Sequence, residues 1–160
     1  MCDMFDAVIS SPFGQLALRC EAKKLVAIEF LAPTIIPHPA FEQALPLSMK
    51  AIVKQFECFF AEPGTALCVP YVLRGTPFQR RVWQALRRIP AGETRTYGEL
   101  AKKLGSAPRA IGGACRANPL PILIPCHRVV SAKDLGGYAG ETQGAKLEIK
   151  QWLLAHEIKK

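Results

Sequence analysis

The chain has 160 residues, of which 49% are hydrophobic and 21% charged, values of an ordinary globular protein that exclude a disordered chain. Its 21 Lys and Arg exceed its 13 Asp and Glu, so the formal net charge of +8 favours a polyanionic partner, nucleic acid before an anionic membrane surface. The most apolar stretch, residues 25–36, is too short to span a bilayer, and the N-terminus lacks the pattern of a signal peptide. We therefore expect a cytoplasmic or nucleoid protein without a membrane partner.

The first 74 residues are predicted to form an α/β domain. Three short β-prone runs, separated by turn sequences, cover residues 7–10, 15–20 and 25–31. Residues 47–60 then carry an apolar stripe of helical period that stops at Pro63-Gly64. A strand-like run over residues 68–72 leads into Gly75, where we place the domain boundary.

Residues 75–160 are predicted to form a second, mostly helical domain. Thr76 caps its first helix, which has Pro77 at the first position and ends before Pro90. Thr96 and Glu99 have the spacing of a capping box and begin the second helix.

Two short helices joined by a tight turn follow the pattern of a helix-turn-helix. The second helix stops at Gly105, and a third begins at Pro108 after only two residues. This third helix contains Gly112 and Gly113, each of which costs about 1 kcal/mol relative to Ala. Either a neighbouring helix packs tightly there, or the slim helix enters a groove of DNA. A short apolar segment with a hairpin and a last helix complete the domain.

The cysteines do not have the spacing of a zinc ribbon or a redox dithiol. In a reducing compartment each is by default a small packed residue unless its context marks it as a nucleophile. The six are Cys2, Cys20, Cys58, Cys68, Cys115 and Cys126.

Cys126 has such a context. It follows Pro125 in a proline-rich apolar segment, residues 119–125, and precedes His127. A free thiol is only a few per cent thiolate at neutral pH, so a nucleophilic cysteine needs a base or a positive charge nearby. In an extended segment His127 points away from Cys126, whereas in a turn or through a water molecule the two can pair. A buried Cys beside a surface His is the non-catalytic alternative.

The segment around Cys126 resembles the signature of the O6-alkylguanine-DNA alkyltransferases, also called methylated-DNA–protein-cysteine methyltransferases. The resemblance covers residues 109–130 (RAIGGACRANPLPILIPCHRVV) and extends to 75–86, 96–101 and 152–157. The N-terminal part matches loosely, through Ser11-Pro-Phe-Gly14. The resemblance implies a ribonuclease-H-like domain at 1–74, with a three-stranded antiparallel sheet and a helix. It implies a winged-helix-like domain with a helix-turn-helix at 75–160.

The resemblance also implies the roles of individual residues. Cys126 matches the alkyl acceptor, His127 the imidazole that takes its proton through a water, and Glu157 the carboxylate that steadies the imidazole. Tyr97 matches the phenol that protonates the leaving guanine. Asn118 matches the asparagine that supports the helix-turn-helix against the active-site turn. The remaining pocket positions for the flipped base are Cys115, Val129, Tyr138 and Gly140.

Residues of the third helix match the DNA-binding positions of the family. Arg109 matches the arginine that fills the stack after the damaged nucleotide is rotated out, which is needed because a stacked base hides its exocyclic oxygen. The recognition helix lies in the minor groove in this family, and Ala110, Gly112, Gly113 and Arg116 belong to it. The expected partner is double-stranded DNA containing O6-alkylguanine, bound by a monomer that can cluster on DNA.

The sequence departs from the family pattern in two places. Residues 141–144 lengthen the loop before the last helix, which affects the pocket rim. The human member holds a structural zinc with two Cys and two His, whereas here Cys2, Cys20 and His38 leave the site one ligand short. We expect neither zinc nor another cofactor.

The expected activity is a single-turnover transfer of an alkyl group from oxygen-6 of guanine, and from oxygen-4 of thymine, to Cys126. One alternative is an alkyltransferase-like damage sensor, but such proteins lack the cysteine of the Pro-Cys-His-Arg motif. A helix-turn-helix regulator needs no cysteine in a rigid turn. A cysteine hydrolase needs an oxyanion-hole motif, and we find none around Cys126.

Overall fold

The computed structural model describes residues 5–31, 45–134, 136–138 and 144–158. The chain divides into two compact units, Met1–Leu73 and Arg74–Lys160. Within the described residues, no helix is long and apolar enough to cross a membrane.

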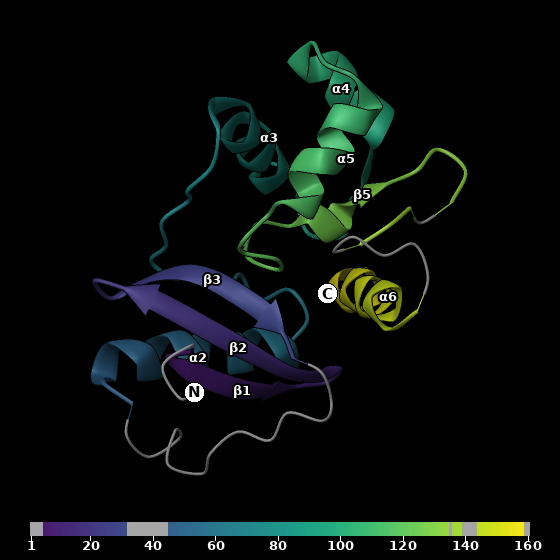
Figure 1. Cartoon of the computed structure of the whole chain (residues 1–160). Helices are drawn as coiled ribbons and strands as arrows, with labels where there is room; N and C mark the ends of the chain where they lie inside the picture. Colours follow the sequence, from purple (N-terminus) through teal and green to yellow (C-terminus); the bar gives the residue numbers. More distant parts are fainter. Residues whose placement is uncertain (1–4, 32–44, 135, 139–143, 159–160) are drawn as a thin grey trace. The chain divides into compact units, whose positions relative to one another are not determined.

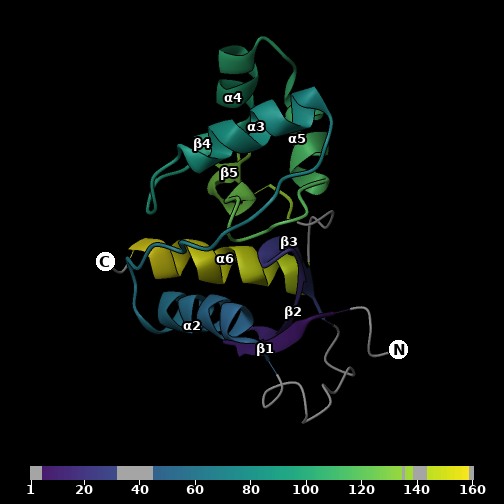
Figure 2. The same ribbon diagram turned by 90° about the vertical axis from the view of Figure 1, so that its left-hand side faces the viewer.

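The first unit is built on a three-stranded antiparallel sheet in the order β1-β2-β3, with β1 at Ala7–Ser11, β2 at Gly14–Glu21 and β3 at Lys24–Phe30. This confirms the predicted three strands. Ala22 and Lys23 form the tight turn between β2 and β3 and both have positive φ, as a two-residue hairpin turn of type I′ requires. Helix α2 (Leu47–Ala61) lies against one face of the sheet, and its buried apolar side chains include Ile52 and Phe56 (Figures 1 and 2).

The expected strand at residues 68–72 does not form. Only an isolated bridge joins Tyr71 to Leu25, supported by hydrogen bonds from Leu25 N to Pro70 O (2.9 Å) and from Val72 N to Leu25 O (3.0 Å). Pro70 has no N–H group, so it cannot donate to a ladder. Within residues 68–72 only Val69 is buried.

The second unit begins with helix α3 (Pro77–Arg87), followed by α4 (Tyr97–Leu104) and α5 (Pro108–Arg116). Both predicted N-caps are present, and each is a complete capping box, Thr76 with Gln79 and Thr96 with Glu99. Gly105 ends α4 in the left-handed conformation.

Trp83 of α3 connects this helix to α5. This side chain is almost completely buried, and its Nε1 donates a hydrogen bond of 2.9 Å to the carbonyl oxygen of Ala114 in α5. Trp83 is not among the core residues expected from the sequence. The guanidinium of Arg81 also binds the carbonyl oxygen of Leu104, at 3.0 Å, which ties the end of α4 to α3.

A short parallel pairing brings the start of α4 to the segment that follows α5. Strand β4 (Arg95–Thr96) pairs with β5 (Val129–Val130), with Arg95 opposite Val129. One 3₁₀ turn, η2 (Cys126–Arg128), precedes β5, and the last helix, α6 (Ala145–Ile158), packs against this turn. Residues far apart in the sequence, from α4, η2 and α6, are thus gathered around Cys126.

Candidate active site

Cys126 lies at the start of a buried turn that its preceding prolines hold in place. Residues 120–127 are all buried, and Cys126 is 6% exposed. Cys126 N donates to Ile124 O at 2.7 Å, and Val129 N donates to the carbonyl oxygen of Cys126. Ile122 has a φ of 77°, which is strained for a β-branched residue. The segment is therefore a rigid turn and not an extended strand. In an extended strand the side chain of His127 would point away from Cys126, and this turn does not impose that arrangement.

Asn118 binds the thiol and the backbone of this turn together. Its Nδ2 donates to the carbonyl oxygen of Ile124 at 2.9 Å and to Cys126 Sγ at 3.3 Å. Its Oδ1 accepts from Leu120 N at 2.9 Å, and its own backbone N–H donates to the carbonyl oxygen of Cys115 at 3.2 Å. One side chain thus fixes the end of α5 to the position of the sulfur.

Burial raises the pKa of the Cys126 thiol to about 11, although the Asn118 hydrogen bond and the positive charge of Lys150 both act to lower it. In the free protein the sulfur is therefore held as a neutral thiol. A reaction at this sulfur needs a base that removes its proton.

His127 has the environment of such a base. It is fully buried, and its Nε2 lies 2.8 Å from Glu157 Oε1. Burial lowers the pKa of His127, against the opposing effect of Glu157, so the imidazole is neutral at pH 7. Its other nitrogen, Nδ1, is buried without a hydrogen-bond partner among the described residues. The ring is thus oriented through one nitrogen, and the other remains to accept a proton.

Glu157 is held as a carboxylate by two partners. Burial raises its pKa, but hydrogen bonds from His127 and Arg128 outweigh this effect and bring the pKa to about 2. Arg128 Nε donates to both carboxylate oxygens, at 3.1 and 2.9 Å, and its Nη2 forms an ion pair with Oε2. Arg128 Nη1 also donates to the carbonyl oxygen of Ile89, at 2.7 Å, which anchors this arrangement to the end of α3.

Tyr97, the first residue of α4, is half-buried and electrostatically coupled to Cys126 and Cys115. Burial, followed by these two thiols, raises the pKa of Tyr97 to about 12. The phenol is therefore protonated at neutral pH and can act as a hydrogen-bond or proton donor. Gly136 has a positive φ of 73°, and a Cβ there would lie 3.1 Å from Tyr97 Cε2, so the ring packs directly on this glycine.

Three of the proposed pocket residues, Cys115, Val129 and Tyr138, lie near Cys126. Val129 and Tyr138 are buried, and burial raises the pKa of Tyr138 well above its usual range. Cys115 is half-buried near the end of α5, and burial raises its pKa strongly. Gly140 lies outside the described residues, as do Cys2 and His38, which entered the zinc expectation. Among the described residues, no group of three His, Cys, Asp or Glu side chains could hold a metal ion.

Lys150 is a site residue that the sequence analysis missed. It lies on α6, is fully buried, and donates from Nζ to the carbonyl oxygens of Val129 and Gly137, at 2.6 and 2.8 Å. A lysine on an otherwise amphipathic helix is usually exposed, so composition alone gives no signal. Its place between Ile149 and Leu153, both core residues, was the only sequence cue.

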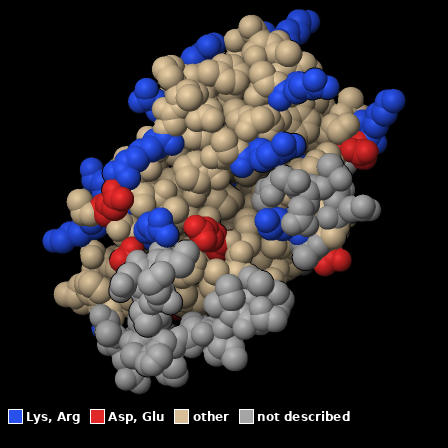
Figure 3. Space-filling view, in the orientation of Figure 1, with Lys and Arg blue, Asp and Glu red and all other residues tan. Residues whose placement is uncertain are grey.

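Helix α5 presents an exposed surface of small and basic side chains, with Arg109, Ala110, Gly113 and Arg116 exposed and Gly112 half-exposed. A Cβ added at Gly112 or Gly113 meets no described atom within 4 Å. Packing within the described fold therefore does not require these glycines. In Figure 3 the part of the surface over α4 and α5 carries Lys and Arg side chains and little acid.

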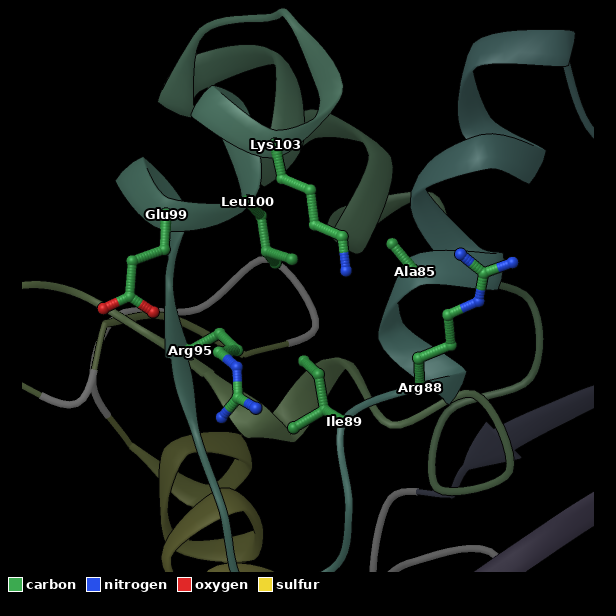
Figure 4. Close-up of a pocket in the computed structure, with 7 residues that line it drawn as sticks. All are labelled: Ala85, Arg88, Ile89, Arg95, Glu99, Leu100 and Lys103. Carbon is green, nitrogen blue, oxygen red and sulfur yellow. The ribbon is translucent and has the colours of Figure 1, made fainter.

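A pocket of about 230 Å³ opens elsewhere in the second unit, between α3, β4 and α4 (Figure 4). Ala85, Ile89 and Leu100 form its apolar floor, and Arg88, Arg95, Glu99 and Lys103 surround it. Cys126, His127 and Tyr97 do not line it. This hollow is therefore distinct from the surroundings of the thiol.

Known proteins are similar to this chain in sequence and in fold. The family model described as 6-O-methylguanine DNA methyltransferase, DNA binding domain, matches residues 77–159. The chain is 40% identical over 152 residues to a methylated-DNA–protein-cysteine methyltransferase of Mycolicibacterium paratuberculosis, covering 93% of this chain and 89% of the relative. A protein of the same name from Salmonella typhimurium is 36% identical over 171 residues, covering 98% and 97%.

Solved structures agree with the sequence relatives. The OGT of Mycobacterium tuberculosis in complex with DNA has a TM-score of 0.75 at 39% identity, covering 95% of this chain and 91% of that one. The three-stranded sheet and the helices described above correspond to this known fold.

Proposed function

Because the chain belongs to the methylated-DNA–protein-cysteine methyltransferase family, we propose that it repairs DNA by moving a methyl or other small alkyl group from guanine to its own Cys126. The group leaves oxygen-6 of guanine, and by the same chemistry oxygen-4 of thymine. The observation that carries the assignment of the acceptor is the buried turn at Cys126. There the thiol is bound by Asn118 and adjoins an imidazole oriented by Glu157.

The proposed reaction is a displacement at the alkyl carbon. His127 removes the thiol proton, through a water molecule at Nδ1, and Glu157 stabilises the imidazolium that results. The sulfur then forms a bond to the alkyl carbon while the carbon–oxygen bond breaks. Tyr97 donates a proton to the leaving base, so that neutral guanine departs, and the proton taken up by His127 then replaces it on Tyr97 through solvent, which leaves no net change in protons. The product is a thioether at Cys126, which is a poor leaving group, so each molecule acts once.

DNA binding is proposed to occur through α5. A slim, basic helix without Cβ atoms at Gly112 and Gly113 suits a narrow groove, where phosphate contacts from arginines supply most of the affinity. Arg109 fills the stack vacated by the flipped nucleotide, and Cys115, Val129, Tyr138 and Gly140 line the pocket that receives it. The partner is duplex DNA with O6-alkylguanine, and we propose a monomer that acts on nucleoid DNA and can cluster along it.

The finer description of the fold belongs to the same proposal. We assign residues 1–74 to a ribonuclease-H-like domain and residues 75–160 to a winged-helix-like domain that carries both the helix-turn-helix and the acceptor. The order of α4, a short turn and α5 supports the second assignment, and the meander of β1, β2 and β3 supports the first.

A burst experiment tests the function. A duplex with one radiolabelled O6-methylguanine is mixed with increasing amounts of protein, and the label transferred to protein is counted. The proposal predicts a single burst whose amplitude equals the protein concentration. Binding of the lesion without transfer would indicate a damage sensor. Sequence-specific binding to undamaged DNA without transfer would indicate a regulator.

A further inference from the structure

The hollow between α3, β4 and α4 has no part in the proposed reaction (Figure 4). Its volume is about 230 Å³, and its floor is formed by Ala85, Ile89 and Leu100, which are 3–5% exposed. An apolar cavity of about 150 Å³ already holds a benzene molecule. The size and the floor of the hollow therefore suit the compact apolar body of a small molecule.

The walls of the hollow carry two cations without a partner in the described fold. Among residues 5–31, 45–134, 136–138 and 144–158, the side chains of Arg88 and Lys103 take part in no hydrogen bond and no ion pair. Figure 4 shows the amine of Lys103 reaching from α4 across the hollow toward α3. Both side chains are thus available to an anion that enters the hollow.

The two other charged residues of the hollow already have partners. Arg95 pairs with Glu93, with 3.2 Å between nitrogen and oxygen. Glu99 Oε2 accepts a hydrogen bond of 3.3 Å from Thr96 N in the capping box, so this carboxylate is held by the start of its own helix. The lining therefore contains three cations and one carboxylate, and its excess charge is positive.

We propose that this hollow is a binding site for a small organic anion: its compact apolar body lies on the floor, and its carboxylate group pairs with Lys103 and Arg88. A guanidinium matches the planar geometry of a carboxylate, and an ammonium adds a further charged donor. An uncharged molecule of the same shape leaves these cations unpaired. An inorganic anion leaves the apolar floor uncovered.

The hollow adjoins residues that hold the catalytic turn. The carbonyl oxygen of Ile89 accepts a hydrogen bond of 2.7 Å from Arg128 Nη1. Arg95 lies opposite Val129 in the pairing of β4 with β5. Cys126 does not line the hollow. An occupant therefore contacts the residues that support the turn and not the thiol itself.

A binding titration with benzoate tests the proposal, and benzamide, which has nearly the same shape and no charge, is the matched control. Binding to the full chain is followed through the NMR signals of the backbone amides. We expect benzoate to shift the amides of Ala85, Ile89 and Leu100 with a Kd of about 1 mM, an affinity that nine heavy atoms can supply. Benzamide should bind about tenfold more weakly, because it does not pair with the cations.

Two neighbouring lysines of α4 supply matched variants. Lys103 lines the hollow and Lys102 does not, and both are exposed. Lys103→Met should weaken the binding of benzoate about fivefold, whereas Lys102→Met removes the same charge and should leave the Kd unchanged. Thermal unfolding checks the fold of both variants. The comparison of benzoate with benzamide on the wild type needs no variant.

Three results would overturn the proposal. The first is equal binding of benzoate and benzamide, or the absence of a saturable shift at the floor amides. The second is a set of shifts confined to Tyr97 and Tyr138, which would place the probe in the proposed base pocket. The third is a loss of duplex affinity specific to Lys103→Met without binding of benzoate, which would assign these cations to the DNA backbone. Because the probes are not DNA, failure of the repair reaction does not affect the outcome.

Discussion

The side-chain amide of Asn118 donates to Cys126 Sγ at 3.3 Å, and this bond links the end of α5 to the acceptor thiol. Helix α5 carries the residues proposed to bind DNA. Asn118 N–H also donates to the carbonyl oxygen of Cys115, so a displacement of the end of α5 would be transmitted to the sulfur. Asn118 thus links the acceptor thiol to the end of the helix that is proposed to bind DNA.

We expect Asn118→Asp to slow alkyl transfer by about 10- to 100-fold. The carboxylate retains an acceptor for Leu120 N–H but loses the donor to the sulfur, and a hydrogen bond to a charged group contributes about 1.5–3 kcal/mol. Single-turnover rates with free O6-benzylguanine measure the effect, with thermal unfolding as the check on the fold. An unchanged rate would show that the bond to Cys126 does not act on the thiolate.

Glu157→Gln should destabilise the second unit by roughly 3–5 kcal/mol at pH 7, because it leaves the partly buried guanidinium of Arg128 without the buried carboxylate that it pairs with. The pKa of Glu157 is lowered from 4.5 to about 2 by folding. The stability that Glu157 contributes is therefore fully present above pH 4.5 and is lost as the pH falls through 2. Urea unfolding of the wild type and of Glu157→Gln should show a difference in the free energy of unfolding that is large at pH 7 and becomes smaller below pH 4.5. A difference that stays constant over this range would contradict the assignment of the charge.

Arg109→Ala and Tyr97→Phe should separate nucleotide flipping from chemistry. Arg109 is exposed on α5, and its removal should slow repair of duplex DNA while sparing the reaction with free alkylguanine, which has no base stack to fill. Tyr97→Phe should slow both reactions, because the proton for the leaving guanine is lost in either substrate. Rate constants for the two substrates, measured side by side, test this division. Equal slowing of both substrates by Arg109→Ala would make the flipping role wrong.

Gly113→Ala should stabilise the protein and weaken its binding to DNA. The added methyl group meets no described atom within 4 Å, so the helix gains about 1 kcal/mol from the better propensity of Ala. In a groove the same methyl group would hold the helix away from the DNA. Thermal unfolding and binding titrations with an alkylated duplex measure the two effects, and the reaction with free alkylguanine serves as the control. A variant that is more stable and binds DNA as tightly as wild type would remove the reason given for this glycine.

Most elements of the fold could be predicted because local signals determine them. Thr76 and Thr96 mark helix starts by capping, and Gly105 marks a helix end, all within a few residues of the element. The prediction of a strand at residues 68–72 was wrong. An apolar pattern does not reveal whether a neighbouring strand can pair along its whole length, and Pro70 removes one hydrogen-bond donor.

The site could be predicted only in part. The pairing of His127 with Glu157 spans 30 residues, and the resemblance, not the spacing, indicated it. The bonds of Lys150 to Val129 and Gly137 depend on the path of the chain between residues 129 and 150, and no local pattern encodes that path. Trp83 was missed because a buried indole on a basic helix can be recognised only once its acceptor, Ala114 O, is in place.

The most direct test of the account is the mass of the protein after reaction with a duplex that carries one O6-methylguanine. With DNA in excess, we expect one added methyl group per chain, located on the tryptic peptide 117–128 at Cys126, and no product from Cys126→Ser even though this variant still binds the duplex. Repair that continues beyond one equivalent, or a methyl group on peptide 110–116 at Cys115, would contradict the claim that Cys126 is the single-use acceptor.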